Sequence, residues 1–322
     1  MSANHNNPGS AQPLGAAGSL RSSALLRRIE ARRRSIDLGI RSHLRSRYDG
    51  EMLSMLHYAT RSGKRLRGTL FLTLCEGSRP PGRSKTELAV SIELGHAASL
   101  VHDDIIDGAA YRRLRKSFWK RYGIKYAVLV PHLLISDALA LAGKFGSVYV
   151  EMSVRAWHRA SRGQYLDMLA LNSAARRRID YTQLIKLKSA SLFECAASMG
   201  AVLSGRRAST VRETANLGTF IGLAYQVIDD LTDSVSAARA GGSALLFRHC
   251  VAELNAHTSP KLTPADFAVR LLAEYRNAYA ARSRLMRDAA LRGFLTHLLM
   301  QKLAEGGNWL GDTAQRVEAL LA

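Results

Sequence analysis

The chain has 322 residues, of which 47% are apolar and 22% are charged, and its formal net charge is +20 at pH 7. This length and apolar content are sufficient for a buried core and exclude a globally disordered chain. The positive charge fits a nucleic-acid binder, a protein drawn to anionic membrane surfaces, or an enzyme for strongly anionic substrates. Composition alone does not choose among these three classes.

The N-terminal residues and the cysteines indicate the cellular compartment. Residues 1–20 are small and polar and lack the apolar segment of a signal peptide, so we expect a flexible tail and a cytoplasmic protein. Cys75, Cys195 and Cys250 lie far apart without a CxxC motif, which argues against a disulfide framework and against a zinc site. The most apolar segment, 127–143, contains proline and aspartate and is too polar for a comfortable membrane span.

A very basic segment follows the tail from Arg21 onward. Ile29, Ile36 and Ile40 are interleaved there with arginines, including the run at 32–34. Such a pattern is more often a solvated helix face. The alternative is peripheral contact of this region with a membrane or another anionic surface.

Apolar residues then recur at spacings of three and four through nearly the whole chain, which predicts helices. The candidate helices are 50–61, 66–77, 85–107, 126–150, 152–172, 180–204, 209–234, 265–288 and 291–303. No segment shows the period-two alternation typical of strands, and no solenoid repeat is visible. We therefore predict an all-α bundle of roughly nine to eleven helices in a single domain over 21–322.

Two acidic clusters are the most informative feature of the sequence. The first, LVHDDIID, places Asp103, Asp104 and Asp107 at the end of the candidate helix 85–107. Asp103 and Asp107 are four residues apart, so they project from one helical face, where like charges repel. A divalent cation would neutralise them, and oxygen ligands without a nearby cysteine favour Mg²⁺ or Mn²⁺ over zinc.

The second cluster, AYQVIDDLTD, repeats this pattern with Asp229, Asp230 and Asp233. One such motif is a weak indication of metal binding, because acidic pairs are common at helix ends. Two of them on apolar helices are a stronger indication, because two helices of a bundle can face each other across a cavity. Their carboxylates would then hold a cluster of Mg²⁺ ions, three by our expectation, against a diphosphate.

Basic side chains accompany the clusters. Lys64, Arg65 and Arg67 lie in SGKRLRG, and the pair Arg112–Arg113 follows the first cluster. Arginine suits bidentate phosphate recognition, and lysine suits a point-charge contact. SGKRLRG lacks the spacing of a P-loop, and taken alone such a run is more often solvated surface.

At these residues the sequence resembles the trans-isoprenyl diphosphate synthases, the polyprenyl synthetase family. GKRLRG resembles the family's GKRxRP element, and ELGHAASLVHDDIIDGAAYRR resembles its first aspartate-rich region. GQYLDM, KSASLFECAASMGAVLSG and AYQVIDDLTD resemble three further blocks, in the family's order, over roughly residues 50–235. The resemblance implies a fold of the isoprenoid synthase type with a central active-site cavity, usually as a homodimer.

The resemblance also implies a reaction, the head-to-tail 1′-4 condensation of isopentenyl diphosphate with a C5 to C15 allylic diphosphate. Five aspartates would hold or support the metal ions: Asp103, Asp104, Asp107, Asp229 and Asp233. Five further side chains would bind substrate diphosphates: Lys64, Arg67, His96, Arg112 and Arg113. Three would lie near the reacting carbons: Lys188, Ser189 and Gln226. His96 has a plainer interpretation, because a single histidine on an apolar helix is more often a packed core residue.

The sequence departs from the family pattern after the second cluster. The expected GKxxGxD stretch is replaced by SVSAARAGGSALLF, and Ser243 falls about where its first lysine would be. Arg239 and Arg248 are candidate replacements at poorer spacing. These departures leave open weakened turnover, a different allylic primer, or a regulatory subunit of a heteromeric synthase.

Product length is predicted from the helix that precedes Asp103. In the family that this chain resembles, bulky residues four and five positions before the first aspartate block the growing chain. Here those residues are Ser99 and Ala98, and Gly95 and Ser91 further up are small too. Unless another helix supplies a plug, we expect no shallow floor and predict the C20 product geranylgeranyl diphosphate, with a longer polyprenyl diphosphate as the alternative.

Two other function classes would explain part of the sequence. A class I terpene cyclase would share the fold and one DDxxD motif, but DDLTD, GKRLR and Arg113 argue against it. Nucleic-acid binding would explain the net charge, but no aromatic-interleaved basic motif supports it, so we expect no nucleic-acid partner.

Overall fold

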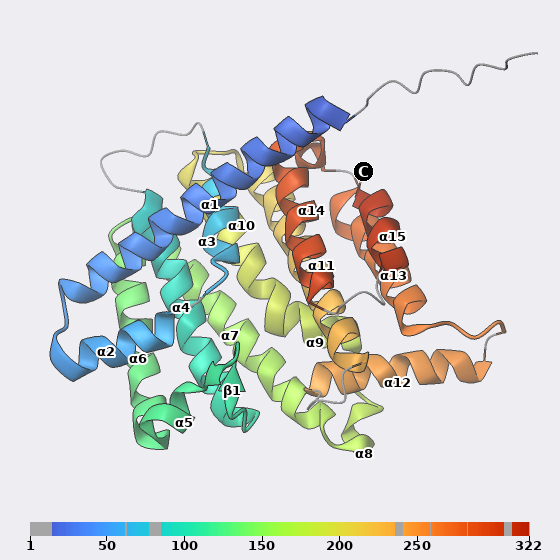
Figure 1. Cartoon of the computed structure of the whole chain (residues 1–322), viewed down its shortest axis with the longest axis horizontal. Coiled ribbons are helices and arrows are strands. Elements are labelled where there is room, and N and C mark those ends of the chain that lie inside the picture. The colour runs from blue at the N-terminus through green and yellow to red at the C-terminus, as the bar shows by residue number, and fades with distance from the viewer. Residues whose placement is uncertain are drawn as a thin grey trace, which may run out of the picture.

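The computed structural model describes residues 15–61, 63–76, 85–235, 241–257, 259–281, 283–305 and 311–321. Within these ranges the chain is a helical bundle, and two strands of two residues each are the only β-structure (Figure 1). The prediction of an all-α fold is confirmed.

The N-terminal half of the bundle surrounds helix α4, which carries the first acidic cluster. Its helices are α1 (Gly15–Arg45), α2 (Gly50–Thr60), α3 (Leu66–Leu74), α4 (Lys85–Ile106), α5 (Phe118–Tyr122), α6 (Ile124–Gly143) and α7 (Ser147–Ala170). Between α4 and α5, strands β1 (Tyr111–Arg112) and β2 (Arg115–Lys116) form an antiparallel hairpin.

The C-terminal half surrounds helix α11, which carries the second cluster. Its helices are α8 (Ser173–Arg176), α9 (Tyr181–Ile185), the π-helical turn η1 (Lys186–Ala190), α10 (Ser191–Leu203), α11 (Ala208–Val235), α12 (Gly242–His257), α13 (Pro264–Tyr275), the π-helical turn η2 (Arg276–Ala280), the 3₁₀ turn η3 (Arg284–Arg287), α14 (Ala289–Ala304) and α15 (Gly311–Leu321).

Helix α11 is apolar on almost every side, which is typical of a helix in the centre of a core. Leu217, Phe220, Leu223 and Ile228 are fully buried, and the helix packs against α10, α13 and α14. Because this packing leaves α11 no freedom to shift, it fixes the position of the acidic cluster near its C-terminal end.

Helix α1 lies along the outside of the bundle and contacts α2, α3, α4 and α14 (Figure 1). Ile36, Ile40 and Leu44 are buried on its inner face, and the mostly buried Arg32 forms an ion pair with Glu76 just after α3. The helix begins at Gly15, within the segment predicted as a tail, and residues 1–14 lie outside the described residues. Membrane contact through this basic helix stays a prediction.

The helix predictions differ from the structure mainly at short and polar segments. The described residues form fifteen α-helices, more than predicted, because the short α5 and α8 and the longer α12 and α15 were not expected, and because the predicted helix 180–204 is divided by the π-helical turn η1 into α9 and α10. The predicted helix 126–150 is wrong at its C-terminal end. The chain breaks instead at Gly146, which has a φ of 120° that favours glycine and directly precedes α7.

Helix α6 is, among the described residues, the one helix long and apolar enough to cross a membrane by length and composition. It packs within the bundle, mainly against α4, through Val130, Leu134 and Leu141, which are buried. Its other side exposes apolar side chains, among them Ile124 and Leu129. The three cysteines are free, as predicted.

Candidate active site

A cavity of about 990 Å³ lies between α3, α4, α7, α11 and α14. Every residue proposed for the site from the sequence lines this cavity, although the segments that carry these residues are far apart in the chain. They are Lys64, Arg67, His96, Asp103, Asp104, Asp107, Arg112, Arg113, Lys188, Ser189, Gln226, Asp229 and Asp233. The fold therefore brings the two acidic clusters and the basic residues to one place.

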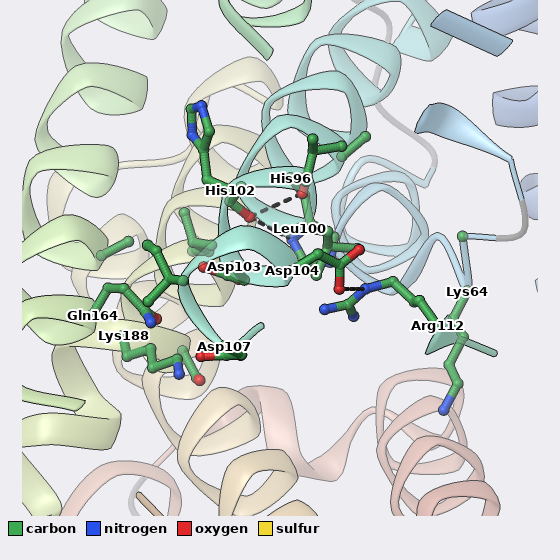
Figure 2. Close-up of a pocket in the computed structure, with 18 of the residues that line it drawn as sticks. Lys64, His96, Leu100, His102, Asp103, Asp104, Asp107, Arg112, Gln164 and Lys188 are labelled. Atoms are coloured by element: carbon green, nitrogen blue, oxygen red, sulfur yellow. Dashed lines mark hydrogen bonds and ion pairs between the residues drawn. The ribbon is translucent and has the colours of Figure 1, made fainter. Parts of the chain in front are cut away.

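The three carboxylates of the first cluster point in two different directions. Figure 2 shows Asp103 and Asp107 pointing to the side of the cavity where Lys188 lies, while Asp104 turns toward Arg112. Arg112 Nε donates a hydrogen bond of 2.7 Å to Asp104 Oδ1. Burial raises the pKa of Asp103 to about 6, although the positive charges of Lys188 and Arg112 oppose this change. Burial also raises the pKa of Asp107, again against Lys188.

The hairpin after α4 presents the arginine pair. Its two-residue turn consists of Arg113 and Leu114, with φ values of 49° and 64°, so both residues are left-handed. Turns of this kind match the twist of the strands but usually contain glycine or asparagine, and a left-handed residue with a side chain costs about 1 kcal/mol. The strained turn holds Arg112 against Asp104 and places Arg113 at the rim of the cavity.

Lys188 lies in the π-helical turn η1, an irregularity that is frequent at functional sites. A Cβ at Gly163 of α7 would lie only 2.2 Å from Lys188 N, so glycine is needed for this close approach. Lys188 Nζ donates to Asp167 Oδ2 at 2.7 Å. Burial disfavours the ammonium, but the carboxylates of Asp167 and Asp103 outweigh it and raise the pKa of Lys188.

A buried hydrogen-bond network supports the centre of the site. Ser189 Oγ donates to Gln226 Oε1 at 2.5 Å, and Gln226 Nε2 donates to Asp230 Oδ1 at 3.1 Å. The hydroxyls of Tyr181 and Ser243 also donate to Asp230, each at 2.8 Å. Burial and the adjacent Asp229 nevertheless raise the pKa of Asp230 to about 7. Asp230, which also lines the cavity, is therefore a supporting group of the network.

The second cluster meets a lysine from the C-terminal part of the chain. Lys302 at the end of α14 forms an ion pair with Asp229, and its Nζ also donates to Glu305 Oε2 at 3.0 Å. Glu305 in turn pairs with Lys64. Burial disfavours the charged form of Lys302, but the negative charge of Asp229 outweighs this effect and raises the pKa of Lys302. Partial burial and the charge of Asp229 raise the pKa of Asp233 to about 6.

The GKRLRG segment is anchored by its buried arginine. Arg65, with a φ of 52°, donates from Nε to Asp37 Oδ1 at 2.8 Å and also donates to the carbonyl of Thr60. This anchored turn begins α3 and directs Lys64 and Arg67 into the cavity.

Arg67 is held by a histidine and an aromatic ring. Its guanidinium lies 4.5 Å from the centroid of Phe193, and its Nη1 lies 2.8 Å from His96 Nε2. Burial and Arg67 lower the pKa of His96 well below its ordinary value, so the ring is neutral. A guanidinium only donates, so His96 Nε2 accepts. Among the described residues, Arg67 Nε has no hydrogen-bond partner, which leaves a buried donor for an anionic ligand.

The donor set fits Mg²⁺. Carboxylate oxygens from α4 and α11 line the cavity, and its described lining contains no cysteine. Within the described parts of the chain, no three His, Cys, Asp or Glu side chains already converge on one point. Because Mg²⁺ is usually bound by a few carboxylates together with substrate phosphates, Asp103, Asp107, Asp229 and Asp233 would share the ions with diphosphate oxygens.

Three residues of the site were missed by the sequence prediction. Gln164 and Asp167 lie in GQYLDM: Gln164 lines the cavity and its side-chain amide has no hydrogen-bond partner within the described chain, whereas Asp167 is buried behind Lys188 and accepts its hydrogen bond. GQYLDM resembles a block of the family, so the sequence contained a signal for Gln164 and Asp167. Lys302 lies outside every segment of recognised resemblance, so only the fold reveals it.

The sequence profile of the polyprenyl synthetases matches residues 50–244, which is more than half of the chain. The chain belongs to this family. A hexaprenyl pyrophosphate synthase of Saccharolobus solfataricus is 34% identical over 204 residues, which cover 62% of this chain and 68% of the relative. The chain is thus a trans-prenyltransferase by family, as the sequence predicted.

Solved polyprenyl synthetases share the fold. A geranylgeranyl pyrophosphate synthetase of Geoglobus acetivorans matches with a TM-score of 0.66 and 22% identity over 88% of this chain and 99% of its own. A polyprenyl synthase of Caulobacter crescentus, solved with calcium and isoprenyl diphosphate, matches with a TM-score of 0.60 and 24% identity over 93% and 91%. At these identities the comparison shows the fold alone.

In the structure of this polyprenyl synthetase, Ser243 supports two buried carboxylates by hydrogen bonds. Its backbone N donates to Asp167 Oδ1 at 2.6 Å, and its hydroxyl donates to Asp230. Ser243 thus ties the start of α12 to the network beneath the two clusters. The fold brings Lys302 to the second cluster from a different helix. Of the two candidate replacements for the expected lysine, Arg248 contacts the backbone carbonyl of Asp233 at 3.5 Å, and Arg239 lies outside the described residues.

The raised pKa of Asp230 predicts a pH-dependent stability. The folded protein holds this proton up to about pH 7, whereas an unfolded aspartate releases it near 3.8. The stability contribution of Asp230 is therefore favourable at low pH and is lost as the pH rises through this window, by on the order of a few kcal/mol. Other carboxylates titrate as well, so the measurement is the difference in unfolding free energy between wild type and Asp230→Asn, in EDTA. The wild type should lose stability relative to the variant between about pH 4 and about pH 7, and a constant difference would contradict this assignment.

The ion pair of Lys302 predicts a role in diphosphate binding. Lys302→Met should weaken the binding of inorganic pyrophosphate with Mg²⁺ about 10- to 100-fold, because a charge-assisted contact contributes about 1.5–3 kcal/mol. Calorimetric titration measures this loss. Lys302→Arg should retain most of the affinity, and Lys144→Met, which removes an exposed lysine paired with Glu87, should retain all of it. Equal affinities of Lys302→Met and wild type would refute the role.

Proposed function

We propose that this polyprenyl synthetase condenses isopentenyl diphosphate with a C5 to C15 allylic diphosphate and releases geranylgeranyl diphosphate, C20, with Mg²⁺ as its metal. The observation that carries this proposal is the arrangement of two acidic clusters, from α4 and α11, around one cavity that also contains buried cationic side chains. The acidic side chains can hold metal ions, and the cationic side chains can bind the oxygens of two diphosphates.

The cationic residues divide between the two substrates. Arg112 and Lys188 lie beside the first cluster and would bind the allylic diphosphate. Lys64, Arg67 and Arg113 line the same cavity and would bind isopentenyl diphosphate. Mg²⁺, when held by the aspartates, supplies charge neutralisation of the departing diphosphate.

The residues between the two diphosphates would protect the reaction. When the allylic carbon–oxygen bond breaks, the electron pair leaves with the diphosphate, and an allylic cation remains. The double bond of isopentenyl diphosphate would then form the new bond to this cation, and the released diphosphate would take up the proton that leaves the adduct. The hydroxyl of Ser189 and the amide of Gln226 present fixed dipoles near this point, and apolar side chains such as Leu100 and Ile135 keep water away.

The length of the product is the finer part of the proposal. The relatives of this chain are named for different products, such as hexaprenyl and geranylgeranyl diphosphates. A longer polyprenyl product is therefore the alternative. A regulatory subunit with weak activity is a second alternative, and it is favoured by the serine at 243 in place of the expected lysine.

We propose in addition that two copies associate through the outer face of α6. Ile124, Tyr126, Val128 and Leu129 are each about half exposed on this face. Neighbouring apolar side chains that remain exposed are typical of interaction sites. We propose the cytoplasm as the location of this pair, with the basic helix α1 as a peripheral membrane contact.

The activity is tested with purified protein, Mg²⁺, isopentenyl diphosphate and each of the C5, C10 and C15 allylic diphosphates. The expected result is an extractable C20 prenyl diphosphate, identified by chromatography after dephosphorylation. Asp103→Asn should lower the turnover rate at least about 100-fold, because it removes a charge that the departing diphosphate and its metal need. Asp49→Asn is the matched control, since Asp49 is exposed and makes no capping hydrogen bond. Absence of product with every primer would overturn the proposal.

The association is tested by sedimentation velocity. The wild type should sediment as a dimer, and Leu129→Glu should shift it toward monomer, because a charge in an apolar interface loses its hydration. Arg155→Glu, which alters an exposed arginine on α7, serves as the control for added negative charge. A monomeric wild type at micromolar concentration would contradict this part of the proposal.

A further inference from the structure

The cavity ends on an aromatic side chain that no part of the sequence analysis had singled out. Trp157 of α7 faces Gly95 of α4 so closely that a Cβ at Gly95 would lie 2.7 Å from Trp157 Cζ2. The indole therefore occupies the space beside α4 that the missing side chain of Gly95 leaves open, while Ala98, one of the residues considered from the sequence, is buried and lines neither cavity. The plug that the sequence could not place comes from another helix.

A second, smaller cavity of about 30 Å³ lies on the far side of the indole. Both cavities are lined by Trp157, Gly95 and Leu192, with Arg67 and His96 at the edge. These shared residues form the partition, and Trp157 is its largest side chain. The second cavity has room for one or two water molecules, so it cannot take a prenyl group while the indole is in place.

The two cavities follow each other along the same four helices. On α4 the lining passes from Asp103 and Ser99 in the first cavity to Ser91 in the second. On α7 it passes from Gln164 to Ser153. Helix α6 passes from Ile135 to Ala138 and Leu139, and α10 passes from Leu192 to Cys195 and Met199. The second cavity is therefore the continuation of the first, away from the carboxylates.

We propose that Trp157 is the floor that stops chain elongation in this enzyme. This inference rests on the proposed function, because it takes an allylic diphosphate as the ligand. The diphosphate lies at the carboxylates, so its apolar tail extends toward the apolar end of the cavity, where Leu100, Ile135 and Ala160 line the wall. The tail grows until it meets the indole.

The distance from the carboxylates to the floor agrees with this assignment. Gly95 precedes Asp103 by eight residues, which is about 12 Å along a helix. The three backbone bonds of an extended peptide residue span about 3.5 Å, so the four chain bonds of an isoprene unit span about 4.7 Å. Two to three units, a C10 to C15 tail, therefore fit above Trp157. A C20 chain, made from a C15 primer, would be too long for the space above Trp157 and could not be elongated again.

The inference is tested by the product of Trp157→Ala. Removing the indole joins the two cavities, so the main product should become longer by at least one isoprene unit, C25 or more, under conditions in which the wild type makes C20. Trp157→Leu should shift the product in the same direction and replaces the alanine variant if that variant does not fold. Thermal unfolding and circular dichroism report on folding.

Two variants provide matched controls. Leu139→Ala enlarges the second cavity but leaves the partition intact, so its product should equal that of the wild type. Adding Ser153→Phe to Trp157→Ala places a ring one turn further along α7, so the product should shorten again relative to Trp157→Ala alone. An unchanged product length in correctly folded Trp157→Ala and Trp157→Leu would overturn the inference.

A binding measurement separates this inference from the proposed function. Unreactive prenyl thiolodiphosphates of C10, C15, C20 and C25 are titrated with Mg²⁺ into the wild type and Trp157→Ala. The wild type should bind the C20 and C25 compounds at least tenfold more weakly than C15, and the variant should lose this difference. If the wild type shows the binding difference but makes no product, the condensation proposal fails and the floor stands. If both proteins bind all lengths equally, the floor fails whatever the activity.

Discussion

The structure depends on the confinement of two groups of like charges in one cavity. Aspartates on α4 and α11 face a space enclosed by apolar helices, where burial raises the pKa of Asp103 to about 6. Such an arrangement persists only when cations are held close to it. The irregular parts of the fold serve this purpose, because a strained hairpin supplies Arg112, a π-helical turn supplies Lys188, and the end of α14 supplies Lys302.

Much of the site was predictable because its acidic and basic residues occur in short, recognisable motifs. The spacing of Asp103 and Asp107 indicates a shared helical face, and a second acidic motif indicates a partner across a cavity. The long apolar helices α4 and α11 were predicted within one residue at each end, since their periodicity is strong. All the predicted site residues line the cavity, and their roles toward substrates and metal remain proposals.

The parts that the sequence could not predict depend on contacts between distant segments. Lys302 follows no motif, and its place beside Asp229 arises only from the packing of α14 on α11. The same holds for Trp157, whose effect on the cavity depends on the absence of a side chain at Gly95. The small residues of α4 describe only one wall of this space, so the sequence of α4 alone does not exclude a plug from another helix. Helix α12 escaped prediction because the glycines before Ser243 and the polar pair Arg248–His249 interrupt the apolar periodicity.

The chain of charges from Asp229 through Lys302 and Glu305 to Lys64 joins the regions proposed for the two substrates. A ligand that takes one lysine away from this chain leaves Glu305 more strongly attached to the other. With the two substrates bound as proposed, occupancy of one region would change the free energy of binding in the other, and thermodynamic linkage would make the effect reciprocal. The end of α14 would thus give the enzyme a means of heterotropic communication between donor and acceptor through side-chain ion pairs.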